Sequence, residues 1–328
     1  MIKGMEFMKP IALAGILNNV YGKTFEPVNY VRGVPISGRL RLAQVLGTQE
    51  DVAFDVKRIV DPLINDFDVR SYIGKDGSVL SGFLWCDELT EATGDDHYVG
   101  AMLKLADLFL QEDSPIDPDL RVEDIFFTGA MVGRASKATQ DQRYVDFLFD
   151  YLLSVHPQPD TGLWWHCESS PYYWGRGNAF VALGYGEALT YLPPNDQRFG
   201  DLVLKHKSHI DTLLSFQHES GSWYQVIDRS DTYLELTATC ILGYVISKGL
   251  NNGWLSGNYG SALSRAWDSI SQCIDEDGNV SNACAGTGPL ATLEEYLLRP
   301  TADGYDDRSG GMALWFAIEY QKFLDTSV

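Results

Sequence analysis

The sequence predicts an all-α fold, an (α/α)6 barrel of six helical hairpins, because two kinds of repetition run along the chain. A turn-like string, "ATGDDHYV" at 92–99, returns as "ATQDQRYV" at 138–145 and more loosely as "PPNDQRFG" at 193–200. Six segments poor in charge open with small residues, at intervals from 44 residues (Gly38 to Gly82) to 72 residues (Ala238 to Gly310). Each interval has room for one helical hairpin, as in architectures of stacked supersecondary units.

The six small-residue segments are expected to be the inner helices, because small side chains let helices crowd together. They begin at Ile36, Leu80, Phe127, Arg176, Leu236 and Arg308. The segment 144–155 is instead amphipathic, with Leu148 and Leu152 on its apolar face, as expected of an outer helix. An open α-solenoid is the alternative. Loops rich in aromatic residues at 160–166 and 219–225 favour a closed barrel, with these loops around one open end, the mouth.

Composition indicates a globular enzyme, and we expect a single catalytic domain over residues 1–328. The net charge of −20 argues against nucleic acid or a membrane as a partner, since both require a basic face. Five cysteines without CxxC spacing are expected to be reduced thiols, and nothing in the sequence requires a metal or an organic cofactor. The apolar run 11–17 is short for a secretory signal, so the cytoplasm is the expected compartment and secretion the alternative.

If the inner helices run parallel, whatever precedes each of them converges on one mouth of the barrel. The residues expected there are Tyr30, Arg32, Asp76, Asp124, Trp174, Arg176, Glu235, Asp306, Asp307 and Arg308. Helix N-termini favour an anionic ligand, aromatic rings stack on sugar faces, and arginine forks onto carboxylates. We therefore expect a sugar that carries a carboxylate, as part of a small oligosaccharide, to bind at the mouth.

Four motifs at successive hairpin junctions resemble those of the unsaturated rhamnogalacturonyl hydrolases, glycoside hydrolase family 105. They are "RVEDIFFTGA" at 121–130, "TGLWWH" at 161–166, "YYWGRGNAFVAL" at 172–183 and "GSWYQVIDRSDTYLELTATC" at 221–240. The resemblance implies an (α/α)6 barrel that removes a Δ4,5-unsaturated uronic acid from the non-reducing end of lyase-generated oligosaccharides. It also implies that Asp124 is the catalytic residue and that Tyr30, His166, Trp174 and Arg176 line the sugar pocket.

The chain departs from the family pattern at two further pocket positions. Asp76 lies about two residues out of register with a second aspartate of the family, and Ser78 is nearest the expected place. Phe180 stands where a second pocket tryptophan is often found. We retain both Asp76 and Phe180 as substrate-binding candidates, with a substrate preference that differs from the best-known branch.

The chemistry of an unsaturated uronide explains how one carboxyl group can suffice. Its vinyl ether takes a proton at C4, water captures the cation at C5, and the resulting hemiketal opens and releases the remaining chain. Asp124 would donate that proton, and burial would keep its pKa high enough to do so; the alternative is a helix N-cap. His166 is expected to donate a hydrogen bond to the sugar. Arg176 is a ligand to the substrate or part of a structural ion pair.

Two other classes of function remain open from the sequence. An inverting glycosidase needs two carboxyl groups about 6.5 to 9.5 Å apart, and Asp124 with Glu235 or Asp76 could supply them. Glu235 is a second acid or the structural anchor of the fifth inner helix. A sugar epimerase or a saccharide-binding barrel is the remaining alternative, although an epimerase usually uses paired histidines and His166 alone is expected at the mouth. The oligomeric state is left open.

Overall fold

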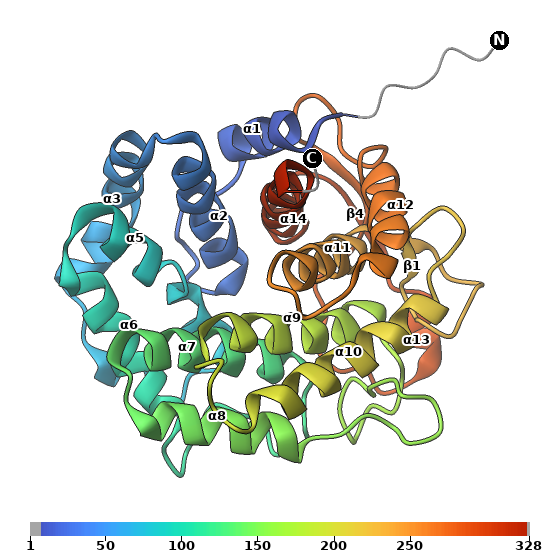
Figure 1. The fold of residues 1–328 in the computed structure, drawn as a ribbon, viewed down its shortest axis with the longest axis horizontal. Coiled ribbons are helices and arrows are strands. Elements are labelled where there is room, and N and C mark those ends of the chain that lie inside the picture. The colour runs from blue at the N-terminus through green and yellow to red at the C-terminus, as the bar shows by residue number, and fades with distance from the viewer. Residues whose placement is uncertain (1–7, 327–328) are drawn as a thin grey trace.

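The computed structural model describes residues 8–326, whose helices form two concentric rings (Figure 1). The inner ring contains α2 (Tyr30–Leu46), α7 (Glu123–Thr139), α9 (Gly175–Tyr191), α11 (Leu236–Asn251) and α14 (Asp307–Thr326). A broken segment fills the place between α2 and α7, and it consists of α4 (Gly77–Leu80), η2 (Ser81–Phe83) and α5 (Cys86–Thr93). Neighbouring inner elements pack side by side from α2 round to α14 and back to α2, so the ring is closed. The predicted (α/α)6 barrel is confirmed.

Each inner element has an outer helix packed against it. The outer ring contains α1 (Pro10–Val20), α3 (Gln49–Asn65), α6 (Asp96–Phe109), α8 (Gln142–Ser154), α10 (Phe199–Ser215) and α12 (Gly260–Ile270). In α8, Tyr144, Leu148 and Leu152 are buried, which confirms the predicted amphipathic outer helix. The second inner helix, predicted as one segment from Leu80, is instead interrupted by the 3-10 turn η2.

The sixth hairpin joins α1 to α14, two helices from opposite ends of the described chain (Figure 1). Leu13 and Leu17 of α1 are fully buried, and the backbone N–H of Ile11 donates to Gln321 Oε1 at 3.3 Å. The apolar run 11–17 therefore has a structural role, since it supplies the inward face of an outer helix.

The inner helices run parallel. Arg41 in the C-terminal half of α2 donates to Glu187 of α9 and to Tyr244 of α11, while Tyr30 at the start of α2 accepts from Arg308 at the start of α14. All inner N-termini consequently open onto one mouth. Most of the remaining short elements lie in connections around that mouth. They are η1 (Val69–Tyr72), the antiparallel pair β1 (Trp223–Tyr224) and β2 (Leu234–Glu235), the antiparallel pair β3 (Val280–Cys284) and β4 (Thr301–Gly304), and α13 (Leu293–Leu297). The exception is η3 (Gly257–Tyr259), which directly precedes outer helix α12.

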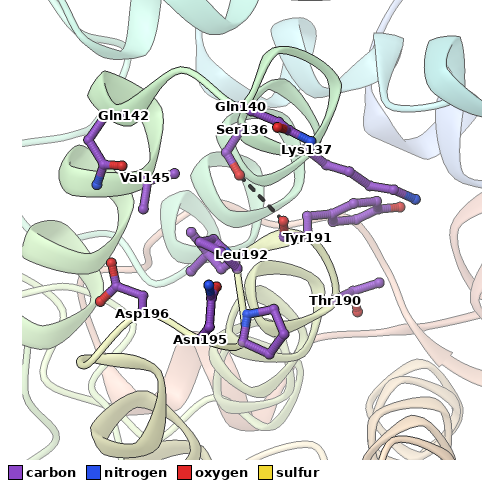
Figure 2. A pocket seen from close by; sticks show the side chains of 12 residues that line it. Ser136, Lys137, Gln140, Gln142, Val145, Thr190, Tyr191, Leu192, Asn195 and Asp196 are labelled. Atoms are coloured by element: carbon purple, nitrogen blue, oxygen red, sulfur yellow. Dashed lines mark hydrogen bonds between the residues drawn. The ribbon is translucent and has the colours of Figure 1, made fainter.

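A cavity of about 620 Å³ opens at the opposite end of the barrel, where α7 and α9 finish (Figure 2). Ser136, Lys137, Gln140, Tyr191 and Asn195 contribute to its lining. Helix C-termini carry partial negative charge, so this end disfavours an acidic sugar, whereas the N-terminal mouth favours one. Over residues 8–326, none of the helices combines the length and apolar character needed to cross a bilayer.

Glycines let α7 and α9 pack backbone against backbone. A Cβ atom on Gly129 would lie 2.5 Å from the carbonyl oxygen of Gly184. We expect Gly129→Ala to cost about 1–3 kcal/mol of unfolding free energy, because one helix must move away from the other. The matched control is Gly100→Ala in outer helix α6, where a Cβ meets nothing within 4 Å. Thermal unfolding should show a lower Tm for Gly129→Ala and an equal or higher Tm for Gly100→Ala; equal Tm values would contradict the tight packing.

Candidate active site

One guanidinium group joins the two aspartates that the sequence places at the mouth. Arg121 Nη2 donates to Asp124 Oδ1 at 2.6 Å, and Arg121 Nη1 lies 2.7 Å from Asp76 Oδ2. The backbone N–H of Asp117 donates to the other oxygen of Asp124 at 2.9 Å. Asp124 therefore does not cap α7, whose N-cap position is Val122. Both aspartates belong to one site despite the shifted register of Asp76.

Their different exposure gives the two carboxyl groups different acidities. Asp124 is 1% exposed, and burial raises its pKa to about 7 even though the hydrogen bond and charge of Arg121 act in the opposite direction. Asp76 is partly exposed, and although burial alone would raise its pKa, hydrogen bonds from Ser78 and Arg121 lower it. At neutral pH, Asp124 is thus able to exchange a proton while Asp76 stays ionised.

Aromatic rings form a wall beside this pair. Tyr30 lies 5.2 Å from Phe127 and 5.7 Å from Phe180 between ring centroids, and Phe126 stacks on Phe180. A Cβ atom on Gly77 would touch both Phe127 and the Oδ1 atom of Asp124, which shows that the wall adjoins the carboxyl group. Phe126, Phe127 and Phe180 are all buried, so that Tyr30 alone of these four rings is partly exposed and the three phenylalanines pack behind it.

His166 is completely buried, with both ring nitrogens bound to protein groups. Its Nε2 atom lies 3.1 Å from Glu123 Oε1, and its Nδ1 atom pairs with the hydroxyl of Tyr296. The imidazole stacks on Trp174, with ring centroids 4.4 Å apart. His166 thus packs against the ring of Trp174. The sequence predicts a hydrogen bond from His166 to the sugar, and the imidazole could make that bond only by giving up Glu123 or Tyr296.

Arg176 is also buried, and its guanidinium is used to hold a loop. Its terminal nitrogens donate to the carbonyl oxygens of Cys284 at 2.5 Å and Ala285 at 3.1 Å, and its guanidinium lies over the Trp174 ring. Glu235 is 3.9 Å away, in an ion pair with Arg176. Of the two roles open to Arg176 from the sequence, the contacts are those of the structural one.

Glu235 is the N-cap of α11 and an anchor for strand β3. Its carboxylate accepts backbone hydrogen bonds from Thr237 at 2.9 Å, from Ala238 at 2.6 Å and from Cys284 at 2.8 Å. It is 0% exposed. These contacts are those of a structural anchor, the second of the two roles open from the sequence.

Three residues of the site, Arg121, Glu123 and Tyr296, are not among those expected from the sequence. The signal for Arg121 was present, because it stands three residues before Asp124 in the same motif, a spacing that brings side chains together on one helical turn. Glu123 adjoins Asp124 but points to His166. Tyr296 comes from α13, 130 residues after His166, and no local pattern reveals that contact.

A family model described as Glycosyl Hydrolase Family 88 matches residues 18–324, which include the mouth and all the inner helices except the last two residues of α14. The chain belongs to this family. The resemblance to the family 105 hydrolases is confirmed as well, since curated relatives and solved structures of that kind match the same chain.

Two curated relatives are similar over part of their length. The unsaturated rhamnogalacturonyl hydrolase YesR of Bacillus subtilis is 27% identical over 192 residues, which cover 54% of this chain and 53% of YesR. An unsaturated 3S-rhamnoglycuronyl hydrolase of Alteromonas sp. is 24% identical over 179 residues, which cover 48% of this chain and 42% of the relative. The chain thus matches only about half the length of these relatives.

Solved structures support the fold over nearly the full chain. A family 105 glycoside hydrolase of C. acetobutylicum has a TM-score of 0.81 at 19% identity, and the match covers 95% of this chain and 98% of the chain of that hydrolase. A family 88 glycosyl hydrolase of Bacteroides vulgatus has a TM-score of 0.78 at 15% identity, covering 96% and 100%. At these identities the likeness establishes the barrel alone.

Proposed function

We propose that this chain removes a Δ4,5-unsaturated uronic acid from the non-reducing end of a small oligosaccharide produced by a polysaccharide lyase. The observation that carries the proposal is Asp124, a buried carboxyl group at the mouth whose pKa burial raises to about 7. The names of the two curated relatives, both unsaturated uronyl hydrolases, support the same substrate class.

In the proposed reaction, protonated Asp124 donates its proton to C4 of the vinyl ether, and positive charge develops at C5 and the ring oxygen. The resulting carboxylate takes a proton from the water that attacks C5, so that Asp124 ends the step protonated again. The hemiketal at C5 then opens by breaking the C5–O5 bond, which leaves a ketone at C5 and a hemiacetal at C1. Collapse of that hemiacetal to an aldehyde breaks the glycosidic bond and releases the remaining sugar chain as an alcohol. Arg121 and the Asp117 amide stabilise the carboxylate between the two proton transfers.

The contacts at the mouth favour this reaction over conventional inverting hydrolysis. Both oxygens of Glu235 accept backbone hydrogen bonds, and Asp76 is held by Arg121 and Ser78. An inverting enzyme uses its second carboxylate to activate water on the opposite face of the sugar, whereas Asp76 and Asp124 bind the same guanidinium, that of Arg121. An epimerase acid–base pair is likewise disfavoured, because His166 binds Glu123 and Tyr296.

We also propose that the barrel acts as one catalytic domain, since the described residues share one hydrophobic core. All five cysteines are unpaired. Free thiols favour a reducing compartment such as the cytoplasm.

The experiment is a substrate panel of lyase-generated unsaturated di- and trisaccharides, each paired with its saturated counterpart. Loss of the ultraviolet band of the C4=C5 bond is expected for at least one unsaturated member, and no release of sugar is expected from the saturated partner. Release of sugar from saturated uronides, with the ultraviolet band of every unsaturated member unchanged, would replace the proposal by inverting hydrolysis.

A further inference from the structure

Four arginines lie within two residues of the start of an inner helix, and three of them have a terminal nitrogen bound to a protein acceptor. Arg121 binds Asp76 and Asp124, Arg176 binds the carbonyls of Cys284 and Ala285, and Arg32 pairs with Asp307. The fourth, Arg308, differs. Within residues 8–326, the terminal nitrogens of Arg308 make no hydrogen bond, and only its Nε atom does, to the hydroxyl of Tyr30 at 3.1 Å.

The Nε atom of Arg308 is fixed by Tyr30, whereas its two terminal nitrogens remain available to a ligand. Asp306 forms an ion pair with Arg308, but its Oδ1 atom is 3.7 Å from Nη1, too far for a hydrogen bond, and its other oxygen accepts from Ser309. The side chain of Arg308 is 16% exposed, so a ligand that binds it is largely removed from water. This combination leaves two parallel N–H donors without an acceptor in a low-dielectric site.

The loop that passes Arg308 lies close to its guanidinium at a glycine. A Cβ atom on Gly286 would lie 3.0 Å from Nη2 of Arg308, so any larger residue at this position would crowd the guanidinium. Arg176 fixes the same loop from its other side through Cys284 and Ala285. Both arginines thus lie against the same loop, but only Arg176 is hydrogen-bonded to it.

We infer that Arg308, and not Arg176, binds the carboxylate of the uronic acid. The inference rests on the proposed function and names the residue that makes the site selective for an acidic sugar. Tyr30 links the two parts of the site, because its hydroxyl fixes Arg308 while its ring belongs to the wall that adjoins Asp124. A sugar ring on this wall can present its carboxylate to the Arg308 fork and its reacting carbon to Asp124. A planar guanidinium matches a carboxylate through two parallel hydrogen bonds.

The test compares an unsaturated uronide with its methyl ester, which keeps the double bond and loses the charge. Arg308→Gln is expected to lower kcat/KM for the acid by about tenfold or more, mainly through KM, and to change that of the ester little. Arg308→Lys should give an intermediate loss, because it keeps the charge without the fork. Arg143→Gln, which removes an exposed charge from α8, is the control and should keep the wild-type preference for the acid.

Unchanged acid-over-ester preference in both Arg308 variants would overturn the inference, as would loss of the preference in Arg176→Lys but not in Arg308→Lys. Circular dichroism and Tm identify a variant that does not fold, in which case Arg308→Lys alone decides. A wild-type protein inactive on every unsaturated substrate would refute the proposed reaction. Calorimetric binding of a saturated uronide and its ester would then still test Arg308, and equal binding by wild type and Arg308→Lys would overturn its role.

Discussion

Asp124→Asn is expected to fold, to bind substrate, and to lose at least about a hundredfold in kcat with KM little changed. Asparagine keeps the shape of the side chain and an oxygen for Arg121, but it cannot donate a proton to carbon. General acid catalysis contributes about 10²–10⁴ in rate, and a group that acts only in the transition state changes kcat and not KM. Steady-state kinetics on the best substrate of the panel measures both.

Isotope labelling tests whether the reaction protonates C4, as a general-acid role of Asp124 requires. In D2O the wild-type protein should place one deuterium at C4 of the released product, because Asp124 protonates carbon and not the glycosidic oxygen. Turnover of Asp124→Asn near the wild-type rate, or a product without deuterium at C4, would show that Asp124 is not the acid. Gly100→Ala in outer helix α6 serves as the unaffected control.

Arg121→Gln is expected to move the alkaline limit of activity to higher pH. Burial raises the pKa of Asp124 to about 7, and Arg121 holds it down from a still higher value. Removing an adjacent positive charge should raise the pKa by about one to three pH units. Because Asp124 must be protonated to begin the reaction, activity falls as pH rises through its pKa. The descending limb of the kcat profile should therefore shift upward in Arg121→Gln.

The rate at the optimum should also fall in Arg121→Gln, because the Asp124 carboxylate would be less stabilised before it takes a proton from water. Arg121→Lys provides the comparison, since it keeps the charge and should retain most of the wild-type pH profile. An alkaline limb that stays in place in Arg121→Gln would mean that Arg121 does not control the protonation of Asp124.

The sequence was sufficient to predict the barrel, because the repeat is local and each hairpin carries its own pattern. It could not predict the break in the second inner helix. That break lies where Gly33 and Gly82 meet so closely that a Cβ atom on Gly33 would be 2.3 Å from the carbonyl oxygen of Gly82. Such a contact between two helices leaves no mark in the periodicity of either one.

The candidate site, like the fold, could be predicted from the sequence only in part. The positions of Asp124, Asp76 and Trp174 follow from which residues precede the inner helices, and the structure brings all three to the mouth. Three partners could not be predicted, namely Cys284 and Ala285 for Arg176 and Tyr296 for His166, because they come from the distant segment 284–296. The acceptor of Arg176 at Cys284 is 108 residues away along the chain. The sequence shows that a group is polar and near the mouth, but not which backbone carbonyl it reaches.

The pairing of α1 with α14 has a consequence for how the molecule is made. The two helices meet through a contact between residues 310 positions apart, so α1 leaves the ribosome long before its partner exists. During that time α1, with Leu13 and Leu17 on its buried face, can pack against α2 but lacks α14, the inner helix with which it makes its larger contact. An open solenoid can fold repeat by repeat, since each unit contacts only its neighbours. Here the first helix must wait for the last, and the ring closes as a late, long-range step whose exposed intermediate invites aggregation or chaperone binding.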